Sequence, residues 1–514
     1  MKFHISLPPR PQLISQDSSA TLIENSRNAS PLVSPELEIT EEEFQEQLEA
    51  FESKLTLKQT QNGNTDPINE TTYENLHHDV ESQTTFIGEP HTSTENKKKF
   101  HIEEDIDFPE GGLTAYLVVF GSFMGFIPGF GILNVLGVFE SYISKNQLAH
   151  YSSSSIGWIF SIYGFVTYTS CIFSGLYFDR NGSRVILSVG SALLFSGLMI
   201  TASCTNYYQF LLALGVMTAF GNGLLMSPLV SVISHYFNKR RGLFASIATL
   251  GGALGGVVLP IMLRSLFARV GFEWAMRILS FISLFCLIIA VVLVKERFTT
   301  KGEENSIMVY LKVFDFQTLR ELPFLFNILG AIFAEIATYS ATTYLTSYAI
   351  SKGFSSSESI LLVTLVNIGC IPGKIVTGYL ADQLGRFNMI IIATLTTGVV
   401  NMALWLPFGS NLTVLYVFAV IYGFTSGSIY SMIPVCCGQT CKTQDFGKRY
   451  STMYFFIAFG VLGGVPCGGA IISNGSAKSY DWFIVFTFIV SLLSALFYGI
   501  ARYCCVGWRI MQKF

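Results

Sequence analysis

Long apolar runs alternate with short polar segments over most of this chain, from Leu113 to Cys505. Each run holds about 20 residues, the length that an α-helix needs to cross the hydrocarbon core of a bilayer. Strands of a membrane β-barrel would instead be segments of about 10 residues with alternating polarity, a pattern that is absent here. The runs predict an all-α polytopic membrane protein with twelve transmembrane helices. The predicted spans are 113–137, 154–177, 185–204, 208–233, 243–266, 274–294, 323–350, 357–380, 388–407, 412–435, 451–473 and 481–503.

Composition agrees with this class. Half of the residues are hydrophobic and 13% are charged, whereas a soluble domain carries about 25% charged residues. The net charge of −3 averages two unlike regions, because the first 107 residues are polar and acidic and the remainder is apolar with basic loops. The chain has no basic domain and no nucleic-acid-binding signature, so we expect no nucleic-acid partner.

Residues 1–107 are predicted to be a disordered cytosolic tail, since polar residues dominate and apolar residues are sparse. One stretch, 39–55, starts like a capped helix and places apolar residues at helical spacing. It is either a short helix that binds a regulatory partner or a nascent helix without a role. The remaining predicted regions are a six-helix half at 108–294, a cytosolic central loop at 295–322, a second six-helix half at 323–505 and a short cytosolic tail at 506–514.

Basic residues predict the orientation in the membrane. Twelve spans put both termini on one side, and loops rich in Lys and Arg face the cytosol. The loops on the side of the termini contain many basic residues, whereas the other side holds only Lys145, Arg269, Lys352 and Lys478. We therefore predict cytosolic termini, in the plasma membrane first and the vacuolar membrane as an alternative.

A short motif occurs twice. The sequence GLYFDRNGSR begins at Gly175, and GYLADQLGR begins at Gly378, 203 residues later (378 − 175). Each copy follows the second span of a predicted block of six. Such a parallel duplication is typical of a transporter in which one half rocks against the other.

A second repeat precedes spans five and eleven. Arg240 and Arg241 come before Gly242, and Gly447 comes before Lys448 and Arg449. Arg241 and Arg449 are 208 residues apart (449 − 241), close to the offset of the first repeat. Glycine-rich stretches follow in both spans, at 251–256 and 463–469. Small residues four apart let helices approach closely, either as static packing or as a sliding surface.

Together the repeats predict a gate. A carboxylate is stabilised at a helix N-terminus or by basic side chains. We therefore expect Asp179 to engage the start of span eleven, and Asp382 the start of span five; the alternative is a solvated loop with a turn glycine. The predicted gate residues are Gly175, Asp179, Arg180, Gly182, Arg184, Gly378, Asp382, Gly385, Arg386, Arg240, Arg241, Lys448 and Arg449.

Two charged residues lie inside predicted spans. Glu335 is in the middle of span seven, where an ionisable group is a functional candidate, or else a structural hydrogen-bonding group. Lys374 in span eight either pairs with Glu335, supplies an anion site, or extends toward the cytosol. The predicted cavity, rich in amides and aromatic rings, suits a planar uncharged solute but also resembles ordinary core. Its candidate residues are Asn134, Asn222, Glu335, Tyr339, Asn367 and Lys374.

Residues 105–505 resemble the major facilitator superfamily, whose signature loop joins spans two and three. A narrower resemblance is to the monocarboxylate porter family. Residues 107–116, DFPEGGLTAY, are similar to its span-one motif with Tyr116 in place of the usual Trp, and residues 236–241 are similar to its span-five motif. Residues 178–182 and 446–454 resemble fungal homologues of that family, a group that includes riboflavin facilitators. The resemblance implies a twelve-helix transporter that works by alternating access.

The chain departs from the proton-coupled members of that family. These members carry a Lys in span one, where this chain has Asn134. They also carry an Asp-x3-Arg-Pro pattern in span eight, where this chain has Asn367 in place of the Asp and Ile371 in place of the Arg. A carboxylate solute in a low-dielectric site needs a paired cation. We therefore expect a carrier of a small organic solute with pH-insensitive uptake, rather than a proton-coupled carrier of simple monocarboxylates. A riboflavin-type facilitated-diffusion carrier is one alternative, and a nutrient sensor without transport is the other.

Enzymatic chemistry has no support in the sequence. The ten cysteines lack zinc-ligand spacing, and the spans lack metalloprotease and nucleophile motifs. We expect no metal and no cofactor. The expected partners are a small-molecule solute, the lipid bilayer and regulatory partners of the N-terminal tail.

Overall fold

The computed structural model describes residues 107–299, 318–472 and 476–507. Three predicted regions therefore lie mostly outside the described residues: the tail at 1–107, the central loop at 295–322 and the C-terminal tail at 506–514. The helices are α3 (Leu113–Ile143), α4 (Ser153–Asn181), α5 (Arg184–Ala202), α6 (Tyr207–Phe210), η1 (Leu211–Thr218), α7 (Ala219–Ser234), α8 (Arg241–Leu293), η2 (Thr318–Arg320), α10 (Leu322–Ser351), α11 (Ser356–Leu384), α12 (Arg386–Val400), η3 (Asn401–Trp405), α13 (Leu406–Phe408), α14 (Leu412–Cys437), η4 (Thr443–Asp445), α15 (Phe446–Ile472) and α16 (Ala477–Val506).

The predicted all-α membrane architecture is confirmed. Eleven helical stretches in the described residues are long and apolar enough to cross a membrane. One of them, α8, has 53 residues, and its backbone leaves the helical region at Gly271, with φ 76° and ψ 177°. Because about 20 residues suffice for one crossing, α8 contains both predicted spans five and six, joined at this glycine.

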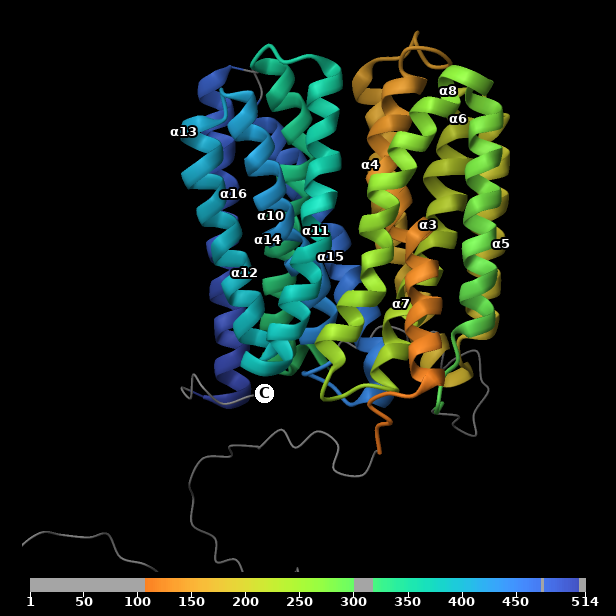
Figure 1. Cartoon of the computed structure of the whole chain (residues 1–514), viewed down its shortest axis with the longest axis vertical. Coiled ribbons are helices and arrows are strands. Elements are labelled where there is room, and N and C mark those ends of the chain that lie inside the picture. Colours follow the sequence, from red (N-terminus) through yellow and green to blue (C-terminus); the bar gives the residue numbers. More distant parts are fainter. Residues whose placement is uncertain (1–106, 300–317, 473–475, 508–514) are drawn as a thin grey trace, which may run out of the picture. The chain divides into compact units, whose positions relative to one another are not determined.

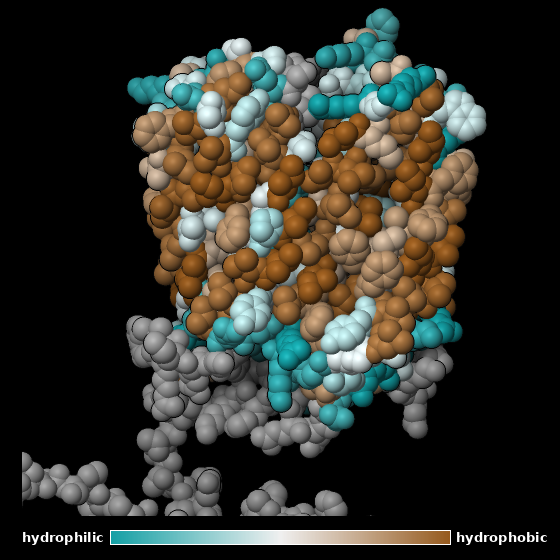
Figure 2. All heavy atoms as spheres, in the orientation of Figure 1, coloured by the Kyte–Doolittle hydropathy of each residue, from teal (hydrophilic) through white to brown (hydrophobic). Residues whose placement is uncertain are grey.

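An apolar surface surrounds the helices. Figure 2 shows a broad hydrophobic band on the visible face, with hydrophilic residues at both ends. Large apolar side chains such as Trp158, Phe281, Phe285 and Val292 are more than half exposed. A soluble monomer rarely exposes a continuous apolar surface of this extent, so the band is the part that contacts lipid.

The helices form two groups that meet along two helix pairs. Figure 1 shows α3 to α8 on one side and α10 to α16 on the other. Helix α4 of the first half packs against α15 of the second, and α8 of the first half packs against α11 of the second. Helices α4 and α11 end, and helices α8 and α15 begin, at the same end of the bundle. We call it the basic end, since it carries Arg241, Arg386 and Arg449.

Candidate functional site

The contact between α4 and α15 is built on glycine. A Cβ atom at Gly175 would lie 2.0 Å from the carbonyl oxygen of Gly447 and 2.0 Å from the Ser451 hydroxyl oxygen. Only glycine permits this approach, which brings Asp179, one turn further along α4, to the first turn of α15. The Asp179 carboxylate accepts hydrogen bonds from the backbone N–H groups of Gly447 at 3.0 Å and Lys448 at 2.7 Å.

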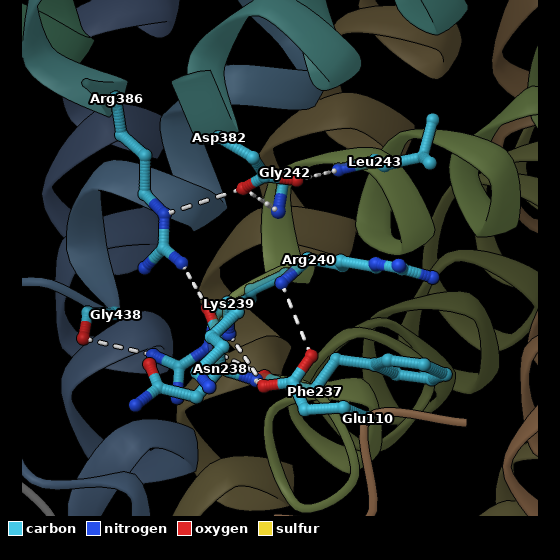
Figure 3. Close-up of polar contacts among 11 residues, drawn as sticks. Glu110, Phe237, Asn238, Lys239, Arg240, Gly242, Leu243, Asp382, Arg386 and Gly438 are labelled. Atoms are coloured by element: carbon cyan, nitrogen blue, oxygen red, sulfur yellow. Dashed lines mark hydrogen bonds and ion pairs between the residues drawn. The ribbon is translucent and has the colours of Figure 1, made fainter. Parts of the chain in front are cut away.

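The contact between α11 and α8 repeats this arrangement (Figure 3). Asp382 accepts hydrogen bonds from the N–H groups of Gly242 at 2.8 Å and Leu243 at 2.9 Å, in the first turn of α8. A Cβ at Gly378 would lie 2.8 Å from the Gly242 carbonyl oxygen. The first turn of a helix has N–H groups without helical partners and a positive dipole end. Each aspartate therefore caps a helix of the opposite half.

These contacts correct the register of the second repeat. Gly242 and Gly447 make equivalent contacts with the two aspartates and are 205 residues apart (447 − 242). The sequence alignment of Arg241 with Arg449 is therefore wrong by three residues. Arg241 precedes its glycine, whereas Arg449 follows its glycine by two positions, so the two side chains have different surroundings.

Arg241 reaches across to the second half. Its Nη1 donates to the Gly438 carbonyl at 3.0 Å and its Nη2 to the Thr443 hydroxyl at 2.9 Å, while Nε donates to Phe237 in its own half. Arg386 reaches the other way and donates to the Asn238 carbonyl (Figure 3). Two predicted gate arginines therefore join the halves in opposite directions.

Arg449 instead stays in its own half. Its two terminal nitrogens bind both carboxylate oxygens of Glu321, at 2.6 and 2.9 Å, and Nη1 also donates to the Thr440 carbonyl. Its guanidinium also lies over the Phe324 ring, 5.2 Å from the ring centre. Arg449 thus holds the start of α15 to the start of α10.

Glu110 is a functional candidate that the sequence argument missed. It lies three residues before α3 with φ 50°, and its carboxylate accepts from the N–H groups of Asn238, Lys239 and Arg240 at 2.7, 2.5 and 3.2 Å. Figure 3 shows it on the other side of the α8 start from Asp382. Two carboxylates, one from each half, therefore hold neighbouring stretches of the same backbone. The signal for Glu110 was present in the span-one motif.

The loop after the first motif is held within the first half. Gly182 ends α4 with φ 84°, and Glu296 accepts from the N–H and the hydroxyl of Ser183 at 3.0 and 2.5 Å. Burial raises the pKa of Glu296, but these hydrogen bonds and the nearby Arg184 lower it more, so the pKa lies below its ordinary value. In the second motif, Gly385 with φ 96° ends α11 directly before Arg386.

His235, beside the same loop, is not a switch at physiological pH. It is stacked on Phe298, with ring centres 4.1 Å apart. Burial, followed by the charges of Arg241 and Arg297, lowers the pKa of His235 to about 3. The imidazole is therefore neutral between pH 5 and 8.

Replacing Arg241 by alanine is expected to lower the initial rate of solute uptake about five- to fiftyfold, because two hydrogen bonds between the halves are lost at about 0.5–1.5 kcal/mol each. Arg240→Ala removes the same charge from the adjacent, exposed position and is expected to stay within about twofold of the parent. Uptake is measured per molecule at the cell surface. Equal losses in both variants would contradict a role for the bonds that cross between the halves.

Further from the basic end, each helix pair has one more polar contact between the halves. Lys374 on α11 donates to the carbonyl of Thr249 on α8 at 2.9 Å. Cys171 on α4 lies 3.7 Å from the hydroxyl of Ser451 on α15, measured from sulfur to oxygen. The Lys374 ammonium is thus used in a contact between the halves. The sequence left open that Lys374 pairs with Glu335, and this pairing is not formed in the structure.

The other five predicted cavity residues fall into two groups. Asn134 and Asn367 come together beside Gly256, where a Cβ would lie 2.4 Å from the Asn367 amide oxygen and 3.1 Å from the Asn134 amide carbon. Each amide nitrogen donates to the carbonyl four residues earlier in its own helix. This group joins α3, α8 and α11.

The second group contains Asn222, Tyr339 and Glu335. Asn222 donates to the carbonyl of Gly129 at 3.0 Å and to the hydroxyl of Tyr163 at 3.2 Å. Since a carbonyl only accepts, the amide orientation is fixed, and its oxygen has no hydrogen-bond partner in the described residues. A Cβ at Gly164, next to Tyr163 on α4, would lie 3.7 Å from the Tyr339 hydroxyl oxygen on α10, so this part of the first half faces Tyr339 of the second. Glu335 lies one turn before Tyr339 on the same helix and is buried.

Comparison with known proteins gives a consistent result. A sequence model of the Major Facilitator Superfamily matches residues 112–363 and 349–503. The riboflavin transporter MCH5 of Saccharomyces cerevisiae is 46% identical over 450 residues, which cover 84% of this chain and 86% of that protein. MFS-type transporter 1 of Ophiocordyceps sp. is 34% identical over 408 residues, covering 79% and 89%.

Solved structures share the fold. The human organic anion transporter MFSD10 superimposes with a TM-score of 0.59 at 14% identity, covering 75% of this chain and 98% of that chain. FucP in the outward conformation gives a TM-score of 0.57 at 16% identity, covering 76% and 98%. At these identities the likeness concerns the arrangement of helices alone.

Proposed function

This chain belongs to the major facilitator superfamily and is a multi-pass membrane transporter, and on that premise we propose that its solute is riboflavin or a closely similar planar, uncharged molecule. The observation that carries the proposal is the 46% identity to a riboflavin transporter over most of both chains. Within the superfamily, we propose the monocarboxylate porter family. Its span-one and span-five motifs are in contact here, because Glu110 binds the backbone of residues 238–240.

The chemistry of the site supports an uncharged solute. Asn134 and Asn367 occupy positions that are charged in proton-coupled monocarboxylate carriers, and they meet at Gly256 between the halves. Amides donate and accept hydrogen bonds without a counter-ion. Riboflavin combines a planar ring with imide and hydroxyl groups, which amides and tyrosines can bind.

The paired contacts at the basic end support a gate. Asp179 and Asp382 each cap a helix of the opposite half, so the basic end cannot open unless both caps break. We propose that the basic end faces the cytosol of the plasma membrane and that this structure is the state closed on that side. Solute then enters from the opposite end.

Cells that lack their own riboflavin carriers and express this chain are expected to take up labelled riboflavin at least tenfold faster than cells with an empty vector. Excess lactate is expected to leave the rate unchanged, because a carboxylate solute needs a paired cation, Asn134 and Asn367 carry no charge, and the Lys374 ammonium is bonded to the Thr249 carbonyl. The assay measures initial uptake of tracer at low external concentration. Uptake of labelled lactate without uptake of riboflavin would refute the proposed solute and return the chain to the monocarboxylate carriers.

A further inference from the structure

A groove lies between α5 and the helices α6 and η1 that begin the next span, at the end of the first half away from the basic end. Figure 1 shows α5 at the edge of the first half farthest from the second, and α5 packs against η1, α7 and α8 of its own half. Three residues of the groove, Ile200, Tyr208 and Leu212, are 50%, 59% and 59% exposed. The groove therefore opens on the outer wall of the first half, where lipid surrounds the protein.

The inner end of the groove is closed by a glycine contact. A Cβ at Gly197 would lie 2.3 Å from the hydroxyl oxygen of Thr218, so α5 and η1 approach closely there. Thr218 donates to the carbonyl of Ala213, five residues earlier, at 2.8 Å, which is the spacing of a π-helix. Six residues separate Gly197 from Ser203, the residue after α5, a distance of about 9 Å along the helix. The groove occupies this stretch.

The volume of the groove is about 650 Å³, which is in the range of sites that bind small organic molecules. Its polar side chains are at the outer end, where Ser203 follows α5 and where α6 begins with Tyr208 and Gln209 near its start. Met199 and Met217 lie further into the membrane, nearer the glycine contact. The groove is thus polar toward the membrane surface and apolar toward the membrane interior.

The charge of the groove indicates a neutral occupant. None of its nine lining residues is charged, and the connection 203–206 between the helices contains neither Lys nor Arg. Recognition of a phosphate headgroup relies on Arg or Lys, whereas a single hydroxyl group needs only neutral partners such as the Ser203 hydroxyl and the Gln209 amide. A lipid that ends in a hydroxyl therefore suits the outer end better than a phospholipid does.

The inner part of the groove favours a rigid apolar body. Methionine side chains such as Met199 and Met217 adapt their shape to the surface that they contact. A flexible acyl chain loses rotational freedom when it is fixed in a groove, whereas a fused ring system has little freedom to lose. One hydroxyl group on a rigid, apolar, fused ring system is the chemistry of a sterol.

We propose that this groove binds one membrane sterol, with its hydroxyl group beside Ser203 and Gln209 and its rings against Met199, Leu212 and Met217. The bound sterol then joins α5 to η1 beyond the point where Gly197 and Thr218 touch. It stabilises the outer end of the first half, where protein contacts alone leave a gap. The inference depends neither on the identity of the solute nor on the proposed gate.

Cys204 reports occupancy of the groove, because it lines the groove and is 5% exposed. Purified full-length protein is placed in phosphatidylcholine vesicles with ergosterol, with cholesterol or with neither, and treated with N-ethylmaleimide. Mass spectrometry gives alkylation of Cys204 relative to Cys467, an exposed cysteine on α15 in the same membrane. Because only the free site reacts, we expect alkylation to slow about fivefold when the sterol is present at about four times its Kd.

Ala213→Leu fills the groove from the side of η1 and is expected to remove the effect of sterol on Cys204. Val216→Phe adds bulk to the same helix at a position that is 38% exposed and does not line the groove. We expect this control to keep the parental protection. Equal loss of protection in both variants would contradict binding in the groove.

A second measurement needs no substitution and applies even if Ala213→Leu folds poorly. A photoreactive sterol with a diazirine on its rings is expected to label residues within 199–217 of the parent protein, and excess unlabelled sterol should suppress the label. Labelling confined to other spans would overturn the proposal, and so would a Cys204 rate that neither sterol changes. Equal protection by diacylglycerol, which has one hydroxyl but flexible chains, would show that the groove takes neutral lipids in general and would refute the sterol.

Discussion

Replacing Gly175 by alanine is expected to lower transport at least tenfold, while the protein still folds and reaches the membrane. The new Cβ would lie 2.0 Å from the Gly447 carbonyl oxygen and from the Ser451 hydroxyl oxygen. Because a backbone oxygen cannot rotate away, α4 and α15 must move apart. Overpacking of this kind costs about 1–3 kcal/mol, and the cost falls only on the state in which the gate is closed.

The chain offers matched controls for this variant. Gly157→Ala is on the same helix, where a Cβ would meet nothing within 4 Å, and we expect parental transport. Gly378→Ala is at the equivalent contact of the other pair. Its Cβ would lie 2.6 Å from the movable hydroxyl of Ser246 and 2.8 Å from a carbonyl oxygen, so we expect a smaller loss than at Gly175.

Two measurements together test the effect of Gly175→Ala. Uptake of tracer per surface molecule gives the loss of transport. Alkylation by N-ethylmaleimide of Cys171, which is fully buried between α4 and α15, reports whether the basic end stays open. We expect reduced uptake together with faster alkylation. Unchanged alkylation with reduced uptake would show that the glycine acts on something other than the gate.

Replacing Ser451 by cysteine is expected to allow a disulfide with Cys171 that stops transport almost completely. The Cys171 sulfur is 3.7 Å from the hydroxyl oxygen that the new thiol would replace, and small rotations bring two sulfurs to the 2.05 Å of a disulfide. A mild copper-based oxidant supplies the oxidation. The bond joins α4 to α15 covalently, so the basic end cannot open, and a thiol reductant should restore at least half of the lost rate.

Ser246→Cys is the control for this lock. Ser246 has the same place on α8 as Ser451 on α15 relative to the contacting glycine, but Lys374 on α11 occupies the place of Cys171. We expect no effect of oxidant on this variant. If oxidised Ser451→Cys, shown by mass spectrometry to carry the cross-link, still transported at the parental rate, the two halves would not separate here and the gate would be refuted.

The membrane architecture was predictable because each span carries its own signal. A run of about 20 apolar residues must form a helix in lipid, whatever its neighbours are. The sequence also drew spans five and six as separate helices, and the backbone does leave the helical region between them, at Gly271. The boundary depended on one backbone conformation that hydrophobicity does not encode.

The contacts of the proposed gate were only partly predictable. The doubled aspartate motif pointed to the starts of spans five and eleven, and Asp179 and Asp382 lie there in the structure. The sequence offered a helix N-terminus or basic side chains as partners, and in the structure backbone N–H groups of the first turns bind both carboxylates. Since every residue except proline has a backbone N–H group, residue type in the sequence does not indicate which ones will serve as partners.

The asymmetry between Arg241 and Arg449 could not be read from the repeat. Both arginines stand within two residues of a glycine at the start of a span, and a difference of three positions decides that Arg241 crosses to the second half while Arg449 binds Glu321 in its own half. Side-chain direction on a helix changes by 100° with each residue. A register derived from similarity alone is therefore too coarse to assign partners.

By itself, the sequence determined that this chain is a duplicated helical membrane protein, because hydrophobic length and repeated motifs are local properties. It also identified Glu335 as an ionisable residue in the middle of a span. Only the tertiary structure decided that Tyr168 and Tyr454 from opposite halves are in edge-to-face contact, and that Lys374 is bonded to the Thr249 carbonyl of the other half. These contacts join residues far apart in the chain, and the packing of helices in three dimensions, rather than any local pattern, sets which of them are neighbours.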